Sequence, residues 1–243
     1  MKRVLPAAAI MICALAGPAS AEELHRASTL LSEGGLTERV IQIFLLVTVL
    51  SLAPGLAMIA TSLPLIVVVL SILRQGLGLQ QSPPNMLIMG VSLFLTWFVM
   101  EPVLQEAWIA GVKPLVANEI AEPEAVRRMT APFAAFMKAR VDPEAVEILA
   151  AARGIEGPFD DGEIRFSLLV PAFALSEIQK AFEIGFVVLL PFLIIDLLVA
   201  SILMAMGMMM VPPAIVSLPF KLAFFVLTNG WVAISGALVR SYS

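Results

Sequence analysis

Four stretches of this chain consist almost entirely of apolar residues. They cover residues 40–73, 86–112, 166–211 and 214–238. A helix that crosses a bilayer needs about 20 consecutive apolar residues, so each stretch is long enough to form one. Pro54, Gly55 and Pro64 interrupt the first stretch, which predicts a broken helix or a re-entrant start there. The pattern therefore predicts an all-α integral membrane protein with two long hydrophobic helical hairpins.

A polar stretch, residues 113–165, separates the two hairpins. It is charged and interrupted by prolines, and apolar residues recur in it at helical spacing: Val126, Met129, Phe133, Phe136 and Met137. This spacing predicts a polar insertion made of short amphipathic helices. The sequence leaves open whether their apolar faces pack within the insertion or dock on a neighbouring subunit.

The beginning of the chain has the pattern of a secretory signal peptide. Lys2 and Arg3 precede an apolar run, and Ala19-Ser20-Ala21 supplies the small residues of a cleavage site. An uncleaved anchor helix is the alternative. Cys13 is the only cysteine and lies inside this segment, so a cleaved chain would contain no thiol.

These observations predict five segments along the chain. They are a signal peptide (1–21), a periplasmic N-terminal segment (22–39), a first hydrophobic hairpin (40–112), a polar periplasmic helical insertion (113–165) and a second hydrophobic hairpin with a methionine loop (166–243). The turns within the hairpins contain Arg74 and Lys221 but no acidic residue, which favours the cytoplasmic side for both turns. The insertion and the end of the second hairpin would then lie outside.

Composition agrees with a membrane location and narrows the possible partners. Hydrophobic residues make up 60% of the chain and charged residues 14%, and the net charge is −4. A typical globular domain has roughly 45–50% apolar and about 25% charged residues. A nucleic-acid-binding surface would require a basic patch, so the acidic balance argues against such a partner.

Several charged residues lie in apolar stretches where lipid would disfavour them. Glu177, Lys180 and Glu183 are three residues apart, so they share a helix face and can form ion pairs. Asp196 lies deeper in its stretch, and we expect it to contact the backbone or the Lys221 of a neighbouring subunit. Because unpaired charges in lipid are costly, these buried ionisable groups favour an assembly with a polar interior.

A methionine-rich segment ends the third apolar stretch. Met204, Met206 and residues 208–210 precede Pro212-Pro213. Methionine side chains are flexible and polarisable, so this cluster predicts a deformable surface such as a pore or gate. Filling of gaps in a helix core is the alternative.

The sequence contains no recognisable catalytic arrangement, cofactor motif or metal site. His25 is the only histidine, which excludes a histidine-based triad or a multi-histidine metal site. The motifs G-x-S-x-G and H-E-x-x-H and a phosphate-binding glycine loop are all absent. We therefore expect a protein that is not an enzyme and needs no cofactor.

Three sequence segments resemble the FliP/SctR family of flagellar and type III secretion export gates. Residues 171–185 (PAFALSEIQKAFEIG) and 219–231 (PFKLAFFVLTNGW) resemble the two family signatures, and 73–85 (LRQGLGLQQSPPN) resembles the turn of its first hairpin. The resemblance extends over residues 40–243.

The resemblance implies a function in protein export. It implies a homopentamer that joins FliQ-type and FliR-type subunits in a helical ring, contacts FlhB-type and FlhA-type proteins and passes unfolded flagellar proteins across the bacterial inner membrane at the flagellar basal body. It assigns Met208, Met209 and Met210 to a gasket around the channel. Glu177, Lys180 and Glu183 would make charge contacts between subunits.

A different class of function remains open from the residues alone. An ion-coupled transporter or proton-channel subunit could use Asp196 and Glu101 as proton relays, because ionisable residues in apolar segments commonly mark ion pathways.

Overall fold

The computed structural model describes residues 58–79, 82–155, 165–208 and 210–242, with single positions 40, 41, 43, 44, 47, 48, 51 and 55. The chain divides into two compact units, Met1–Pro54 and Gly55–Ser243. The predicted signal peptide (1–21) and N-terminal segment (22–39), with Cys13 and His25, lie outside the described residues. So do Met209 and much of the first apolar stretch before residue 58.

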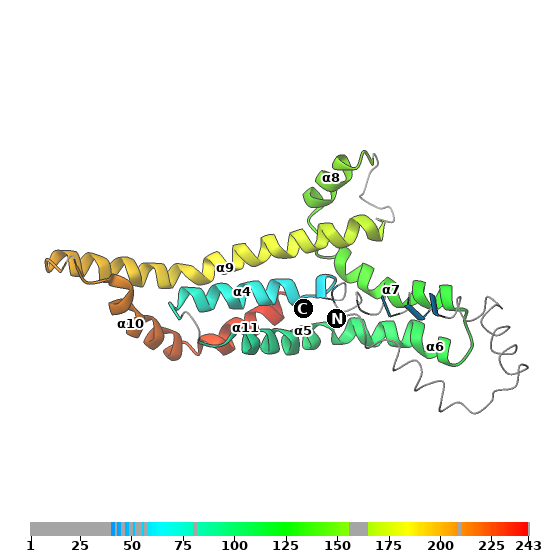
Figure 1. Cartoon of the computed structure of the whole chain (residues 1–243), viewed down its shortest axis with the longest axis horizontal. Helices are drawn as coiled ribbons and strands as arrows, with labels where there is room; N and C mark the ends of the chain where they lie inside the picture. Colours follow the sequence, from blue (N-terminus) through cyan, green and yellow to red (C-terminus); the bar gives the residue numbers. More distant parts are fainter. Residues whose placement is uncertain are drawn as a thin grey trace, which may run out of the picture. The chain divides into compact units, whose positions relative to one another are not determined.

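The second unit is helical throughout its described part, and no strand occurs there (Figure 1). Its elements are α4 (Leu63–Gly76), α5 (Asn85–Ala107), the π-helix η1 (Trp108–Val112), α6 (Lys113–Val116), α7 (Glu122–Lys138), α8 (Pro143–Ala152), α9 (Phe166–Ala205), α10 (Pro213–Leu227) and α11 (Gly230–Arg240). The prediction of an all-α membrane protein is confirmed at the level of fold class.

Helix α4 forms the centre of the unit and packs most extensively against α9. Its residues Leu65, Ile66, Val69, Leu70 and Leu73 are all fully buried. Two glycines allow this close packing. A Cβ on Gly76 would come within 2.5 Å of Leu189 Cδ2 on α9, and a Cβ on Gly185 of α9 within 3.1 Å of Ile72 Cγ2 on α4. A larger residue at either position would require the side chains of Leu189, Phe192 or Ile72 to move.

The helix that begins with α5 continues past the predicted start of the insertion. The segments α5, η1 and α6 form one helical run over Asn85–Val116, which is long and apolar enough to cross a membrane. Gly111 in the π-helical turn lies against α7, where a Cβ would come within 2.9 Å of the Ala125 carbonyl oxygen. The absence of a side chain at this position therefore allows α7 to pack against η1.

The predicted amphipathic helices of the insertion are α7 and α8. Met137 of α7 is fully buried and packs in a cluster with Leu169 and Phe173 of α9. Val146 and Ala150 of α8 pack in a second cluster with other residues of α9. Both helices of the insertion thus dock on the first turns of α9 within the same chain.

The last apolar stretch is two helices, whereas the sequence predicted one. Helices α10 and α11 meet at an angle of 59°. Asn229 between them has a left-handed backbone (φ 49°), which ends α10 and redirects the chain. The aromatic ring of Phe225 occupies the space that a Cβ on Gly230 would need.

This break also bears on the number of membrane-spanning helices in the described part. Among the described residues, Asn85–Val116 and Phe166–Ala205 are each long and apolar enough to span, and the bent pair α10–α11 would make a third. Helix α4 has 14 residues, which is short for a bilayer crossing. The described part thus contains two or three helices that could span, and the first of the four spanning helices expected from the sequence lies largely outside the described residues.

Candidate functional site

Asp196 and Lys221 form an ion pair within one chain. The Lys221 Nζ atom lies 2.6 Å from Asp196 Oδ2, and the Ser217 hydroxyl donates a hydrogen bond of 2.5 Å to Asp196 Oδ1. Lys221 also donates to the Gly76 carbonyl oxygen at 3.1 Å. The side chain of Lys221 is 7% exposed and that of Asp196 is 36% exposed, so the lysine is the more buried partner.

This network joins three helices. Gly76 is the last residue of α4, and the carbonyls of a helix's last turn have no partner within the helix. A lysine ammonium satisfies one of these carbonyls and interacts favourably with the negative end of the helix dipole. Asp196 of α9 in turn holds the lysine of α10. We expected Asp196 to contact the backbone or a neighbour's Lys221, whereas the structure pairs it with Lys221 of its own chain.

Glu177 lies in a second network, whose other members sequence reasoning missed. Its carboxylate is fully buried, and Arg140 Nε lies 3.0 Å from Glu177 Oε1. The hydroxyl of Tyr242 donates a hydrogen bond to Glu177 Oε2. Arg140 precedes α8 and is 37 residues from Glu177 in sequence, so residue spacing gave no signal for this pair.

Lys180 and Glu183 have a different environment from Glu177. Both side chains are exposed, and neither forms an ion pair with another described residue. The ion pairs that their spacing allows are therefore not formed among the three residues within the chain. The assignment of all three to contacts between subunits stays a prediction, and the carboxylate of Glu177 already has two partners within its own chain.

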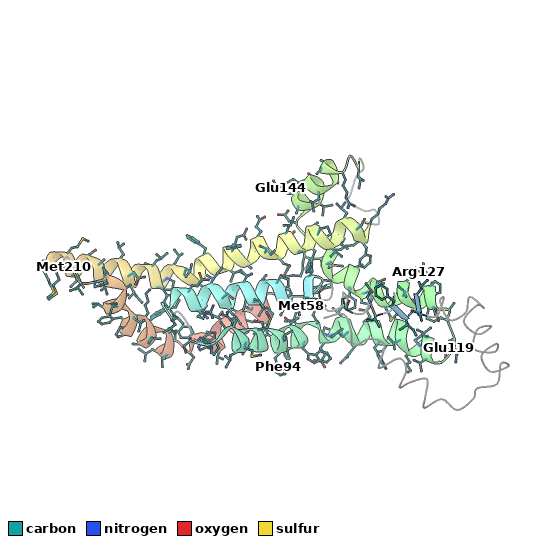
Figure 2. All side chains as sticks on the ribbon, viewed as in Figure 1. Met58, Phe94, Glu119, Arg127, Glu144 and Met210 are labelled. Atoms are coloured by element: carbon teal, nitrogen blue, oxygen red, sulfur yellow. The ribbon has the colours of Figure 1, made fainter. Side chains whose placement is uncertain are left out.

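The described methionines at the turn between α9 and α10 are exposed. Met208 is 45% exposed and Met210 is 97% exposed, and Figure 2 shows Met210 at the left, where α9 ends and the chain turns into α10. Gly207 has a positive φ of 75°, which ends α9 just before them. By contrast, Met100 is 1% exposed, so methionines elsewhere in the chain do fill the core.

The two proposed relay residues do not belong to one network. Glu101 is exposed on α5, and its hydrogen-bond partner is Gln105 on the same helix, at 3.1 Å. The partners of Asp196 all lie on α10. Among the described residues, no hydrogen bond or ion pair links Glu101 with Asp196.

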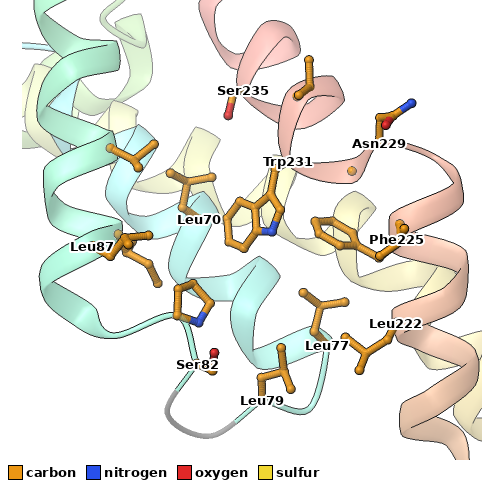
Figure 3. A pocket seen from close by; sticks show the side chains of 16 residues that line it. Leu70, Leu77, Leu79, Ser82, Leu87, Leu222, Phe225, Asn229, Trp231 and Ser235 are labelled. Carbon is orange, nitrogen blue, oxygen red and sulfur yellow. The ribbon is translucent and has the colours of Figure 1, made fainter.

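A cavity of about 680 Å³ lies among α4, α5, α10 and α11 (Figure 3). Leu70, Leu222, Phe225 and Trp231 contribute to an apolar lining. Of the described residues around it, none is acidic, basic or histidine. Across the described ranges, no group of three or more His, Cys, Asp or Glu side chains could hold a metal ion.

Comparison with known proteins identifies close relatives of this chain. Residues 46–238 match the FliP family. The chain is 47% identical over 214 residues to "Flagellar biosynthetic protein FliP" of Agrobacterium fabrum, with 87% of each chain covered. It is 45% identical over 240 residues to the protein of that name from Caulobacter vibrioides, with 98% of this chain and 90% of the relative covered.

A relative with lower sequence identity gives the same result. The protein of that name from Bacillus subtilis is 41% identical over 202 residues, with 83% of this chain and 91% of the relative covered. The resemblance inferred from the signature segments is confirmed. With its helical fold and these relatives along most of its length, the chain belongs to the FliP family.

Proposed function

We propose that this protein is a channel-forming core subunit of the flagellar type III protein export gate and is not an enzyme. It assembles in the bacterial inner membrane at the flagellar basal body as a homo-oligomer, a pentamer by analogy with its family. FliQ-type and FliR-type subunits join it, and FlhB-type and FlhA-type proteins contact the complex. Unfolded flagellar proteins are its substrates. The family membership supports this function and gives the transporter alternative no support.

The exposed face of α9 is the observation that carries the proposal. Only 17% of an apolar stretch of this helix is buried, so most of its surface needs lipid or another protein. Lys180 and Glu183 lie on α9 among exposed apolar residues such as Phe182 and Phe186. Lipid is a poor environment for two charges, whereas a neighbouring subunit can supply partners for them. This favours an assembly over a monomer surrounded by lipid.

The methionine turn fits a gasket around the channel. A gasket must block small ions and still yield to polypeptides of varied sequence, and flexible thioethers suit both requirements. The exposure of Met208 and Met210 supports this function, because both side chains are available to line an opening. Met209 is assigned to the gasket by the family resemblance.

The orientation proposed for the chain is that the N-terminal segment and the insertion are periplasmic. The turns that follow α4 and α9 would then face the cytoplasmic side. Lys221, which the sequence placed in a turn, is buried within α10 instead.

Native mass spectrometry of the protein extracted in mild detergent tests the assembly. We expect a ring of several copies that takes up co-expressed FliQ-type and FliR-type subunits. The variant Lys180→Met should reduce the yield of this ring, whereas Lys138→Met, a change at an exposed lysine of α7, should leave it unchanged. A monomer or dimer that ignores both partners would refute the proposed function.

Membrane conductance tests the gasket. Replacement of Met208, Met209 and Met210 together by alanine should raise the leak of small ions while secretion persists. Replacement of the buried Met100 by leucine is the control and should leave conductance unchanged. Equal conductance in the triple variant and the wild type would contradict the gasket.

A further inference from the structure

Tyr242 makes contacts with three separate parts of the chain. Its hydroxyl donates a hydrogen bond to Glu177 of α9. Its ring stacks on that of Phe136 in α7, with 6.0 Å between the ring centres and 13° between the planes. Arg140 lies on the segment between α7 and α8, and its guanidinium carbon is 3.7 Å from the centre of the Tyr242 ring. We call Tyr242, Phe136, Arg140 and Glu177 the Tyr242 latch.

Arg140 holds the latch together from the other side. Its Nε atom pairs with Glu177 Oε1 at 3.0 Å, and its Nη1 atom donates to the Ser241 carbonyl oxygen at 2.8 Å. The arginine therefore contacts both α9 and the residues that follow α11. A guanidinium suits this position because its donors point in several fixed directions and its face stacks on an aromatic ring.

Because Glu177 is buried, its carboxylate depends on each of its hydrogen-bond donors in the Tyr242 latch. Its side chain has no exposed surface, so water cannot replace a lost donor without a local opening. A buried carboxylate that loses one of its donors is strongly disfavoured. Among the described residues, two side chains donate hydrogen bonds to this carboxylate: Tyr242 through its hydroxyl and Arg140 through Nε.

The latch lies where the insertion turns from α7 into α8. The neighbouring attachment is the backbone N–H of Asp142, which donates to the Ser176 hydroxyl of α9 at 2.9 Å. Asp142 also caps α8, since its carboxylate accepts from the N–H of Glu144 at 3.0 Å. The direction in which α8 leaves this junction thus depends on how firmly the junction is held on α9.

The insertion precedes α9, α10 and α11 in the chain, so the latch can close only after these helices have folded back. Tyr242 follows α11 and must lie on the same side of the membrane as the α7–α8 junction to reach Arg140. Lys180 and Glu183 of the proposed subunit contact lie within two helical turns of Glu177. A closed latch therefore fixes α9 and the insertion beside that contact.

We propose that Tyr242 is a positioning residue, which locks the α7–α8 junction onto α9 and so prepares the subunit for assembly. The assembly part of this inference rests on the proposed function, whereas the local locking does not.

Hydrogen–deuterium exchange on the full-length protein in detergent tests the locking. The variants Tyr242→Phe and Tyr242→Ala should exchange faster than the wild type over residues 139–152, by about tenfold for the alanine variant. The phenylalanine variant keeps the ring stack and should show a smaller increase. Exchange in α4 should not change, and Val232→Ala, at an exposed position on α11, should match the wild type throughout.

Two exchange results would overturn the inference. The first is unchanged exchange over residues 139–152 in Tyr242→Ala. The second is an equal increase in α4, because that would show a general loss of stability rather than a local release of the junction.

Native mass spectrometry of the same variants tests the assembly part. We expect the ring yield to fall in the order wild type, Tyr242→Phe, Tyr242→Ala. A full ring yield in the alanine variant would overturn the assembly part. If the wild type itself formed no ring, the proposed function would fail, and the exchange experiment would still decide the locking.

Discussion

Loss of the Lys221 ammonium should destabilise the subunit more than loss of any exposed lysine. The variant Lys221→Met keeps a flexible chain of similar length but removes the charge and its donors. Asp196 then loses its ion-pair partner, and the Gly76 carbonyl at the end of α4 loses its donor. The change therefore loosens the contact of α10 with both other helices at once.

The structure sets the expected size of this effect. Removal of one partner from a fully buried ion pair costs about 3–5 kcal/mol. Asp196 is 36% exposed and can regain water, so we expect a smaller loss of about 2–3 kcal/mol in the free energy of unfolding. Because Lys180 is exposed and forms no ion pair with a described residue, Lys180→Met should change this free energy by no more than about 0.5 kcal/mol.

Unfolding in mixed micelles with increasing sodium dodecyl sulfate, followed by tryptophan fluorescence, measures both variants. Asp196→Asn and the double variant complete a double-mutant cycle, and the double variant should be less destabilised than the sum of the single changes. The reasoning would be refuted if Lys221→Met and Lys180→Met had the same unfolding free energy, or if the cycle showed no coupling.

Two further predictions concern the close packing of the insertion and the environment of the only tyrosine. Gly111→Ala should destabilise the protein by about 1–3 kcal/mol, because its Cβ would collide with Met129 of α7. Gly90→Ala has free space and should be neutral or stabilising by up to about 1 kcal/mol. Thermal unfolding measures both variants, and a shift of both melting temperatures in the same direction would contradict this prediction. Burial, and then the negative charge of Glu177, raise the pKa of Tyr242 above its ordinary value of 10.0. The stability contributed by the neutral phenol is therefore fully present below pH 10.0 and is lost as the pH rises through the pKa of the folded protein. If the folded protein developed phenolate absorbance at the same pH as free tyrosine, this prediction would be wrong.

The apolar pattern predicted the fold class because membrane helices need long apolar stretches, and this requirement is visible in any sequence. It did not predict the break at Asn229, because an asparagine in an apolar run does not by itself indicate that the backbone will be left-handed at that position. It also missed the Gly76 carbonyl as a partner of Lys221, because backbone acceptors carry no residue-specific signal. Ser217, four residues before Lys221, was a signal that could have been used, because both residues share a helix face.

Some charged residues of the site could be recognised from the sequence, and others could not. Asp196 and Lys221 could be singled out because each is an isolated charge in an apolar stretch. Arg140 could not, because it lies in a polar insertion where charged residues are common and usually solvated. Only the folding of the insertion back onto α9 brings Arg140 to Glu177, and that contact depends on packing between distant segments.

The length of α9 gives it the properties of a lever arm. Glu177 and Ala205, the last residue of α9, are 28 residues apart, which is about 42 Å along a helix with a rise of about 1.5 Å per residue. A tilt of about 5° at the Glu177 end would thus move the other end by about 4 Å, if the helix were rigid. Pro191 lies between them and has no N–H to donate to the Val187 carbonyl, so α9 can bend at this position. Bending at this position would displace the methionine end while the Tyr242 latch stays closed.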